Sequence, residues 1–146
     1  MRVFTFILLG VIALPGCISA VPPSVEVIGA ELTDQSPQGA RVEVALVLSN
    51  SNNVAIQLPE TSYTLAVGDT GSYAYIDIPG RVLGPKGVQA LRLPAAFETD
   101  GRSISGEDWR INGTLTYAPE NYLRNFLTET GVPLPLVLFS GNGTLD

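Results

Sequence analysis

The sequence predicts an all-β protein, an antiparallel sandwich of about seven or eight strands with one short helix before the last strand. Several segments alternate apolar and polar residues with a period of two, which is the pattern of a half-buried strand. Turn signals rich in glycine, asparagine and proline separate these segments. Strands at this spacing favour hairpins over the βαβ units of a parallel sheet. A length of 146 residues fits a single domain.

The first expected strand changes phase within one apolar run. Val25 and Val27 share one face, whereas Ile28, Ala30 and Leu32 fall on the other face. Because side chains of a strand alternate strictly, such a slip predicts a β-bulge or a strand that passes from one sheet to the other.

Three longer segments alternate most regularly: Arg41–Leu48, Gln89–Phe97 and Trp109–Tyr117. Two shorter runs lie between them. We expect the apolar set of each segment to face the core. These sets are Val42, Val44, Leu46 and Leu48; Tyr63, Leu65 and Val67; Ala74, Ile76 and Ile78; Leu91, Leu93, Ala95 and Phe97; and Trp109, Ile111, Gly113, Leu115 and Tyr117.

One helix is expected between the last two strands. Pro119 suits the first position of a helix, where its missing N–H has no partner to lose, and Gly131 would end it. The apolar residues between them fall on one stripe, which predicts a helix that covers one end of the core. That stripe consists of Tyr122, Leu123, Phe126 and Leu127.

The first residues of the chain have the pattern of an export signal. Arg2 supplies a positive charge, and the apolar run that follows is too short to span a bilayer but matches the core of a secretory signal. The run ends in Leu14-Pro15-Gly16-Cys17, which resembles the bacterial lipobox, with Leu14 and Gly16 at the positions that fit the pattern. The resemblance implies a lipoprotein signal peptide over residues 1–16 and a fatty acid on Cys17, the single cysteine of the chain.

Two other outcomes stay open at this N-terminus. Cleavage after Ile18-Ser19-Ala20 would discard Cys17 and release a soluble domain, and an uncleaved helix would bury the thiol. In the lipidated form, residues 17–23 are a short linker that reaches only about 20 Å from the membrane. No aspartate follows Cys17, which favours the periplasmic face of the outer membrane over the inner membrane.

The order of features over residues 24–146 resembles one known family. An alternating strand leads to the turn Asn50-Ser51-Asn52, then to Tyr63-Thr64-Leu65 and a glycine-rich turn, and a late strand carries Gly113 at its centre. This order is similar to the late-embryogenesis-abundant type-2 domain, also called the water-stress and hypersensitive-response domain. The resemblance implies an immunoglobulin/fibronectin-III-like sandwich, no catalytic residues, and a role in tolerance of desiccation and other stress.

Composition excludes several kinds of chemistry. The chain has no histidine, which removes histidine-dependent catalysis and histidine metal sites, and one cysteine cannot build a zinc cage. Eight basic against fourteen acidic residues leave no basic footprint for nucleic acid. We therefore expect a protein that is not an enzyme and has neither cofactor nor metal. The remaining candidates, interpreted as solvated surface groups, are Glu107 with Asp108, Asp69 with Asp77, and Ser103 with Ser105.

Three functions remain. The preferred one is a membrane-anchored lipoprotein that protects the cell envelope under water loss through weak, non-catalytic contacts. The first alternative is a subunit of an envelope protein complex, which would dock through a sheet edge or an apolar loop patch. Tyr73, Tyr75 and Phe139 would belong to such a surface if they face outward, but ordinary packing in the second sheet is the preferred interpretation of these aromatics. The second alternative is a binding module that holds an apolar ligand such as a lipid between its sheets.

Overall fold

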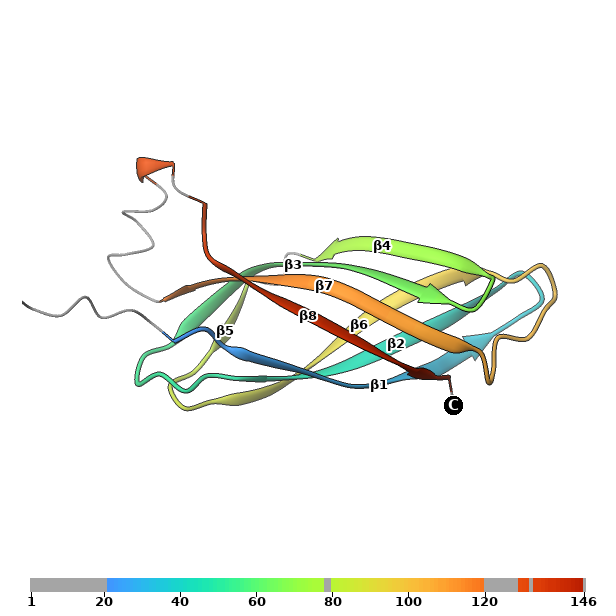
Figure 1. The fold of residues 1–146 in the computed structure, drawn as a ribbon, viewed down its shortest axis with the longest axis horizontal. Helices are drawn as coiled ribbons and strands as arrows, with labels where there is room; N and C mark the ends of the chain where they lie inside the picture. Colours follow the sequence, from blue (N-terminus) through green and yellow to red (C-terminus); the bar gives the residue numbers. More distant parts are fainter. Residues whose placement is uncertain (1–20, 78–79, 120–128, 132, 146) are drawn as a thin grey trace, which may run out of the picture.

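Eight β-strands build nearly all of the described protein (Figure 1). The computed structural model describes residues 21–77, 80–119, 129–131 and 133–145. The strands are β1 (Ser24–Gln35), β2 (Gly39–Ser49), β3 (Ile56–Val67), β4 (Gly71–Asp77), β5 (Arg81–Leu83), β6 (Val88–Glu98), β7 (Asp108–Pro119) and β8 (Leu136–Thr144).

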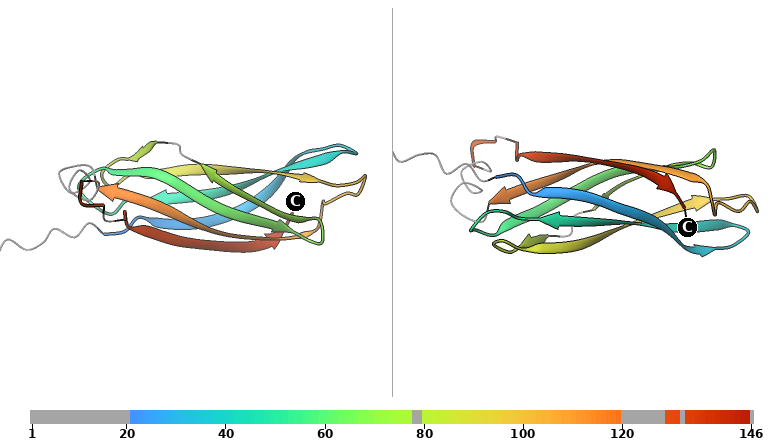
Figure 2. Two further views of the ribbon diagram at one scale, coloured as in Figure 1. Left: turned by 90° about the horizontal axis from the view of Figure 1, so that it is seen from above. Right: turned by 60° about the horizontal axis from the view of Figure 1, so that its bottom comes forward.

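The strands form two antiparallel sheets that face each other (Figure 2). Sheet A has the order β1-β2-β6, and sheet B has the order β4-β3-β7-β8, with β5 paired to the first residues of β3. Long, nearly continuous registers join β2 to β6 and β3 to β7. The expected antiparallel β-sandwich is confirmed.

Apolar side chains from both sheets fill the space between the layers. The sets expected from β2, β3, β6 and β7 are buried, and Val42, Val44, Leu65, Leu93 and Ile111 are fully enclosed. Because each strand alternates, the opposite sets of β2, β6 and β7 are more exposed, and the set of β7 is largely polar, whereas that of β6 is mostly small apolar residues and proline. The periodicity in these four strands therefore predicted the core correctly.

Two glycines let aromatic rings lie flat on sheet B. The Phe139 ring covers Gly113 so closely that a Cβ at this position would lie 2.2 Å from the ring's Cζ atom. The Trp109 indole lies against Gly143, its register partner on β8, in the same way. Gly141 admits the side chain of Val27, so that β1 and β8 close one side of the sandwich where the two sheets do not pair. These contacts fill the interior around β7 and β8.

The predicted irregularity in β1 is confirmed. The β1–β2 register shifts between Val27 and Gly29 and again between Leu32 and Asp34. At the first shift the side chain of Ile28 points to solvent, while Ala30 beyond it returns to the core. The extra residue thus accounts for the phase change seen in the sequence.

The orientation expected for β4 is wrong. Ala74 and Ile76 of the expected inward set face solvent, and Ile78, its third residue, lies outside the described residues. Tyr73 and Tyr75 turn toward Tyr63 of β3, with ring centroids 6.0–6.4 Å apart within this group. The register pairs Tyr75 directly with Tyr63, and three rings at the open edge between β4 and β6 cover more apolar surface than alanine and isoleucine would. The preferred interpretation of Tyr73 and Phe139, ordinary packing, is confirmed, since Tyr73 packs on the core and Phe139 is buried, whereas Tyr75 is 44% exposed.

The helix expected before the last strand lies largely on residues 120–128, which are outside the described residues, and it is not confirmed. Pro119, taken as its first residue, instead ends β7 and pairs with Ile56. Of the expected helix, the described residues show only Glu129 and Thr130 in helical conformation. In the part of the chain that is described, no helix has the length and hydropathy needed to cross a membrane.

Tyr63 makes the free energy of unfolding depend on pH in the alkaline range. Its hydroxyl donates a hydrogen bond to the Pro94 carbonyl of β6, across the open edge. Burial, with smaller contributions from Tyr73, Asp77 and Tyr75, raises the pKa of the Tyr63 phenol well above its usual value of 10.0.

Above about pH 10 the unfolded chain loses the Tyr63 proton, whereas the folded protein keeps it. The free energy of unfolding therefore falls as pH rises above about 10. We expect the loss to be smaller in Tyr63→Phe, measured by urea unfolding at pH 8 and pH 11; equal losses in both proteins would contradict this assignment.

Candidate functional site

The two ends of the sandwich differ in chemistry. The proximal pole contains Val21–Pro23, the loops 50–55 and 84–87, and the strand ends next to them, and it is the end at which the described chain begins. The distal pole contains the turns 36–38 and 68–70, the loop 99–107 and the end of β8. Figure 2 shows both poles and the chain entering at the proximal one.

The predicted site residues fall into two groups. Leu14, Gly16 and Cys17 lie outside the described residues, so the lipid attachment stays a prediction. Asn50 and Asn52, the turn residues that carry the family resemblance, both lie at the proximal pole in the loop between β2 and β3.

Asn50 is a buried polar side chain that holds two loops together. Its amide nitrogen Nδ2 donates to the carbonyl oxygens of Val54 at 2.8 Å, Gly84 at 2.9 Å and Leu83 at 3.2 Å. Its backbone N–H donates to the Gly87 carbonyl at 2.9 Å. The hydrogen bond to Leu83 is buried and the other two are partly buried, and carbonyls withdrawn from water need such donors. Asn50 therefore joins the loop 50–55 to the loop 84–87.

Asn52 joins the same loop to the beginning of the described chain. Its Oδ1 accepts from the Val21 backbone N–H at 2.8 Å, and its Nδ2 donates to the Val21 carbonyl at 2.7 Å. Asn50 positions Asn52, because Asn50 Oδ1 accepts from both the backbone N–H and the Nδ2 of Asn52 at 2.9 and 2.8 Å. Pro23, two residues after Val21, is buried. The body of the protein thus holds the chain from Val21 onward.

Lys86 completes this network from the second loop. Its backbone N–H donates to the Asn52 carbonyl at 3.0 Å, and its ammonium Nζ donates to the Ser51 carbonyl. The Lys86 backbone has a φ of 52°, the left-handed region that a tight turn requires. The two loops and the entering chain are one hydrogen-bonded unit.

Exposed aliphatic side chains surround the proximal pole. Their exposed fractions run from 38 to 69%, and they come from the entering chain, the loop 50–55, and the ends of three different strands, β5, β6 and β8. We call this set the apolar collar: Val21, Val54, Val82, Val88 and Leu136.

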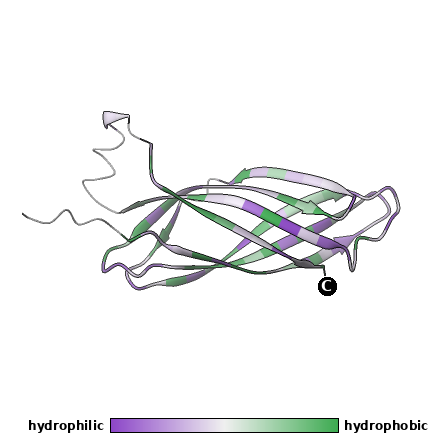
Figure 3. Ribbon diagram, viewed as in Figure 1, coloured by the Kyte–Doolittle hydropathy of each residue, from purple (hydrophilic) through white to green (hydrophobic). Residues whose placement is uncertain are grey.

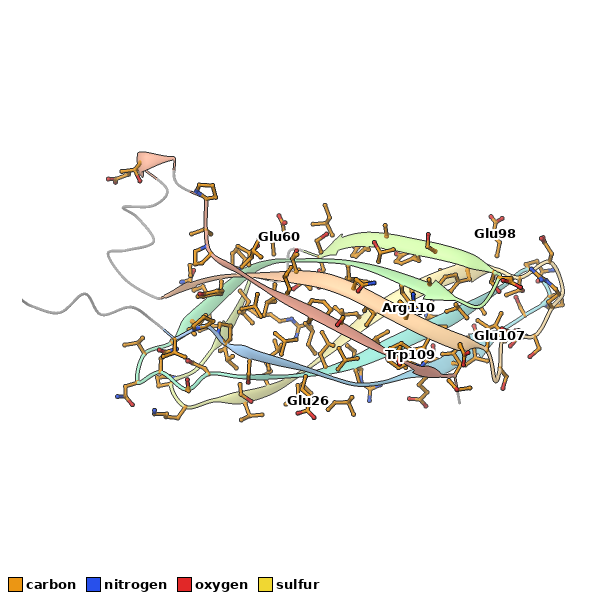
Figure 4. The ribbon with its side chains drawn as sticks, viewed as in Figure 1. Glu26, Glu60, Glu98, Glu107, Trp109 and Arg110 are labelled. Carbon is orange, nitrogen blue, oxygen red and sulfur yellow. The ribbon has the colours of Figure 1, made fainter. Side chains whose placement is uncertain are left out.

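The distal pole has the opposite character. Its loops are coloured as hydrophilic in Figure 3, and Figure 4 shows Glu98, Glu107 and Arg110 near this end. The large hydrophobic side chains that are exposed in the described part of the chain all lie outside the distal turns and loop. The ends therefore differ mainly in exposed apolar surface.

The carboxylates that the sequence singled out lie at the surface or far apart. Asp69 precedes β4 and Asp77 ends it, so a whole strand of about 20 Å separates them. Asp108 accepts a hydrogen bond from Thr144 Oγ1 at 3.2 Å, and both side chains are exposed. Within the described residues, no three acidic or cysteine side chains gather in a way that would hold a metal ion.

An open depression of about 650 Å³ lies on the outer face of sheet B close to the distal pole. Its polar groups are one carboxylate, one guanidinium, one amide and one hydroxyl, from Asp108, Arg110, Asn142 and Thr144. Ser103 is elsewhere, in the loop 99–107, where its hydroxyl accepts from the Ser105 backbone N–H at 3.3 Å and stabilises a turn. These groups are those of a hydrated surface, and the proximal pole is the better candidate for a functional site.

Sequence reasoning found Asn50 and Asn52 as a turn and missed their connection to Val21 and to the loop 84–87. It also missed the apolar collar. A signal for the collar was present, because Val54, Val82 and Val88 are aliphatic residues close to the turn signals at Asn53, Pro79-Gly80 and Gly84 to Gly87, where polar residues are usual.

Comparisons with known proteins support the fold alone. No family model matches the sequence, and no curated protein matches it. The fold is similar to that of a provisionally assigned late embryogenesis abundant (LEA) protein solved in solution, with a TM-score of 0.60 and 14% identity over 84% of this chain and 70% of that chain. It is also similar to a protein from Arabidopsis thaliana, with a TM-score of 0.56 and 16% identity over 92% of this chain and 88% of that one. A protein provisionally named ApaA from Bordetella pertussis gives a TM-score of 0.59 at 12% identity over 86% and 94% of the two chains.

Proposed function

We propose that this protein is a non-enzymatic lipoprotein of the bacterial cell envelope, anchored by a lipid on Cys17, that protects envelope components during water loss. In this proposal the anchor is on the periplasmic face of the outer membrane. The likeness of fold to an LEA protein supports a role under stress, and the lipobox resemblance supports the anchor.

The contact between Asn52 and Val21 is the observation that carries the proposal. Val21 is bound to the body of the protein through both its N–H and its carbonyl, and it lies four residues after Cys17. Four residues of fully extended chain span at most about 14 Å. Because Val21 is bound to Asn52, only the part of the expected linker before Val21 separates the lipid from the domain. A lipid on Cys17 would therefore keep the domain directly at the membrane surface.

The charge of the mature chain suits weak contacts with many neighbours. Removing Arg2 with the signal leaves seven basic residues against fourteen acidic ones, a charge of −7. Carboxylates at the surface stay hydrated and repel one another, so acidic molecules between envelope components keep these components from associating as water is lost. This action needs a folded domain with a charged surface and no reaction centre.

Replacing Cys17 with alanine tests the anchor and the protective role together. We expect labelled palmitate to enter the wild-type protein and the control Ser19→Ala but not Cys17→Ala, which should leave the membrane fraction. Cells that carry Cys17→Ala should then survive drying as poorly as cells that lack the protein. Unchanged palmitate labelling of Cys17→Ala would contradict the anchor, and full survival of the deletion strain would contradict the protective role.

A second candidate function, a subunit of an envelope complex, is favoured by one observation. Leu138 of β8 is 74% exposed, and the register places it on one row across sheet B with Thr114, Ser62 and the exposed Ile76. Leu138 and Ile76 are the two apolar residues of this row, with the polar Thr114 and Ser62 between them, and exposed apolar side chains on a sheet face suit a protein partner. If the protein is a subunit, crosslinking in cells should capture one partner at fixed stoichiometry, Leu138→Asp should abolish the capture, and deletion should leave drying tolerance unchanged.

An apolar ligand between the sheets receives no support from the packing. Phe139, Trp109 and Val27 occupy the interior space above Gly113, Gly143 and Gly141. We therefore do not propose a ligand-binding function.

A further inference from the structure

We propose that the apolar collar lies in the headgroup region of the membrane, so that the protein stands upright on its proximal pole. This inference rests on the lipid anchor proposed above. It adds a second membrane contact, made by the folded domain itself, and it assigns the bilayer surface as the partner of the collar.

The first step of the argument is the geometry of attachment. Asn52 and the buried Pro23 hold the chain at the proximal pole, so the anchor and the collar belong to the same end of the molecule. The chain between Cys17 and Val21 reaches at most about 14 Å, whereas a strand of eleven or twelve residues is about 35–40 Å long. The tether is too short for the domain to lie far from the membrane or to turn its distal pole toward it.

The second step is the arrangement of the collar. Val88 continues the outer face of sheet A, Leu136 begins the outer face of sheet B, and Val82 lies on β5 at the edge of sheet B. Val21 and Val54 lie between them in the entering chain and in the loop 50–55. Single exposed hydrophobic residues are ordinary on a protein surface, but a ring of five around one pole, with none in the distal loops described, indicates contact with an apolar phase.

The third step is the distribution of charge. Near the proximal pole, Arg81 and Lys86 offset only two of four carboxylates, those of Glu26, Glu60, Asp77 and Glu129. The distal pole carries more acidic than basic groups. The distal carboxylates are those of Asp34, Asp69, Glu98, Asp100, Glu107 and Asp108, and the distal guanidiniums are those of Arg41, Arg102 and Arg110. The two ends thus differ by about one charge, so anionic headgroups favour the proximal pole only slightly, and the orientation depends mainly on the short tether and on the collar.

The experiment measures which residues lie near the lipid headgroups. The acylated full-length protein is placed in vesicles of phosphatidylethanolamine and phosphatidylglycerol that contain a lipid with a spin label on its headgroup. A fluorophore is attached to one introduced cysteine at a time, Val54→Cys or Val88→Cys in the collar, or Gln38→Cys in the exposed distal turn as the control. We expect severalfold stronger quenching at both collar positions than at the control. Mass spectrometry of the same samples reports the acyl chains on Cys17.

A second set of variants tests whether the collar side chains cause this orientation. In a protein labelled at Leu136→Cys, the changes Val54→Glu and Val88→Glu together should reduce quenching severalfold, because carboxylates stay hydrated, whereas Gln38→Glu should leave it unchanged. All these positions are exposed, and circular dichroism checks that the sandwich is retained. Equal, weak quenching at all positions of an acylated, vesicle-bound protein would overturn the inference and leave the anchor standing. A protein without acyl chains that does not float with the vesicles would overturn both proposals.

Discussion

Replacing Gly113 with alanine is expected to lower the free energy of unfolding by about 2–3 kcal/mol. The new Cβ would lie 2.2 Å from Phe139 Cζ and 2.7 Å from the carbonyl oxygen of Ser62. The ring cannot move away freely because it is buried, and the carbonyl belongs to the β3 backbone that pairs with β7. Urea unfolding of the unacylated domain, followed by the fluorescence of Trp109, measures the change.

The matched control for this experiment is Gly29→Ala in β1. A Cβ at Gly29 has no atom within 4 Å, and its backbone lies in the ordinary range for a side chain. We expect this variant to stay within about 0.5 kcal/mol of the wild type. Equal stability of the Gly113 and Gly29 variants would show that the close packing of Phe139 on β7 does not hold the sandwich together.

Replacing Asn50 with alanine is expected to lower the free energy of unfolding by about 3 kcal/mol. The change removes the donor shared by the carbonyls of Val54, Leu83 and Gly84, and the loss is most costly at Leu83, where the hydrogen bond is buried, while the other two are partly buried. It also removes the acceptor that positions Asn52. Hydrogen exchange should therefore show faster exchange at the Val21 amide than in the wild type, in addition to the change in urea unfolding.

Replacing Asn50 with aspartate separates the role of the donor from that of side-chain volume. A carboxylate of the same size would face three carbonyl oxygens, which raises the pKa of the introduced group in the folded protein above its unfolded value. The folded form then binds a proton that the unfolded form releases, so the stability of Asn50→Asp should rise as pH falls toward 4. Ser51→Ala, in the same turn and exposed, should behave as the wild type. An aspartate variant as stable as the wild type at pH 7 would contradict the assigned hydrogen bonds.

Much of the fold could be predicted because most strands bury one face. The alternation of Val42 to Leu48, and likewise of Trp109 to Tyr117, reports which side of the strand meets the other sheet. The irregular register of β1 could also be predicted, because an extra residue changes the phase of the apolar side chains.

The wrong prediction for the inward face of β4 has a physical cause. Both faces of this edge strand carry large apolar side chains, Tyr73 and Tyr75 on one and Ile76 on the other, so alternation alone does not choose between them. The choice depends on Tyr63, which lies across the register on β3. A contact of this kind depends on which strands pair, so the local sequence pattern does not predict it.

The candidate site shows the same limit. The sequence identifies Asn50 and Asn52 as turn residues, but their partners Leu83, Gly84 and Val21 lie about 31 to 34 positions away in the chain. Local spacing therefore predicts the turn and gives no information about what the turn holds. Aliphatic residues beside turn signals are visible in the sequence, but they form one collar only because the fold brings five separate segments to one end.

The central claim is that Cys17 carries the lipid that holds this sandwich at the membrane. The most direct measurement is the intact mass of the protein extracted from membranes of its native host, with fragmentation to locate the first residue. The proposal predicts a chain that starts at Cys17 and is heavier than its sequence by the mass of a diacylglyceryl group, with or without a further acyl chain. A chain that starts at Val21, with the mass of the bare polypeptide, would contradict it.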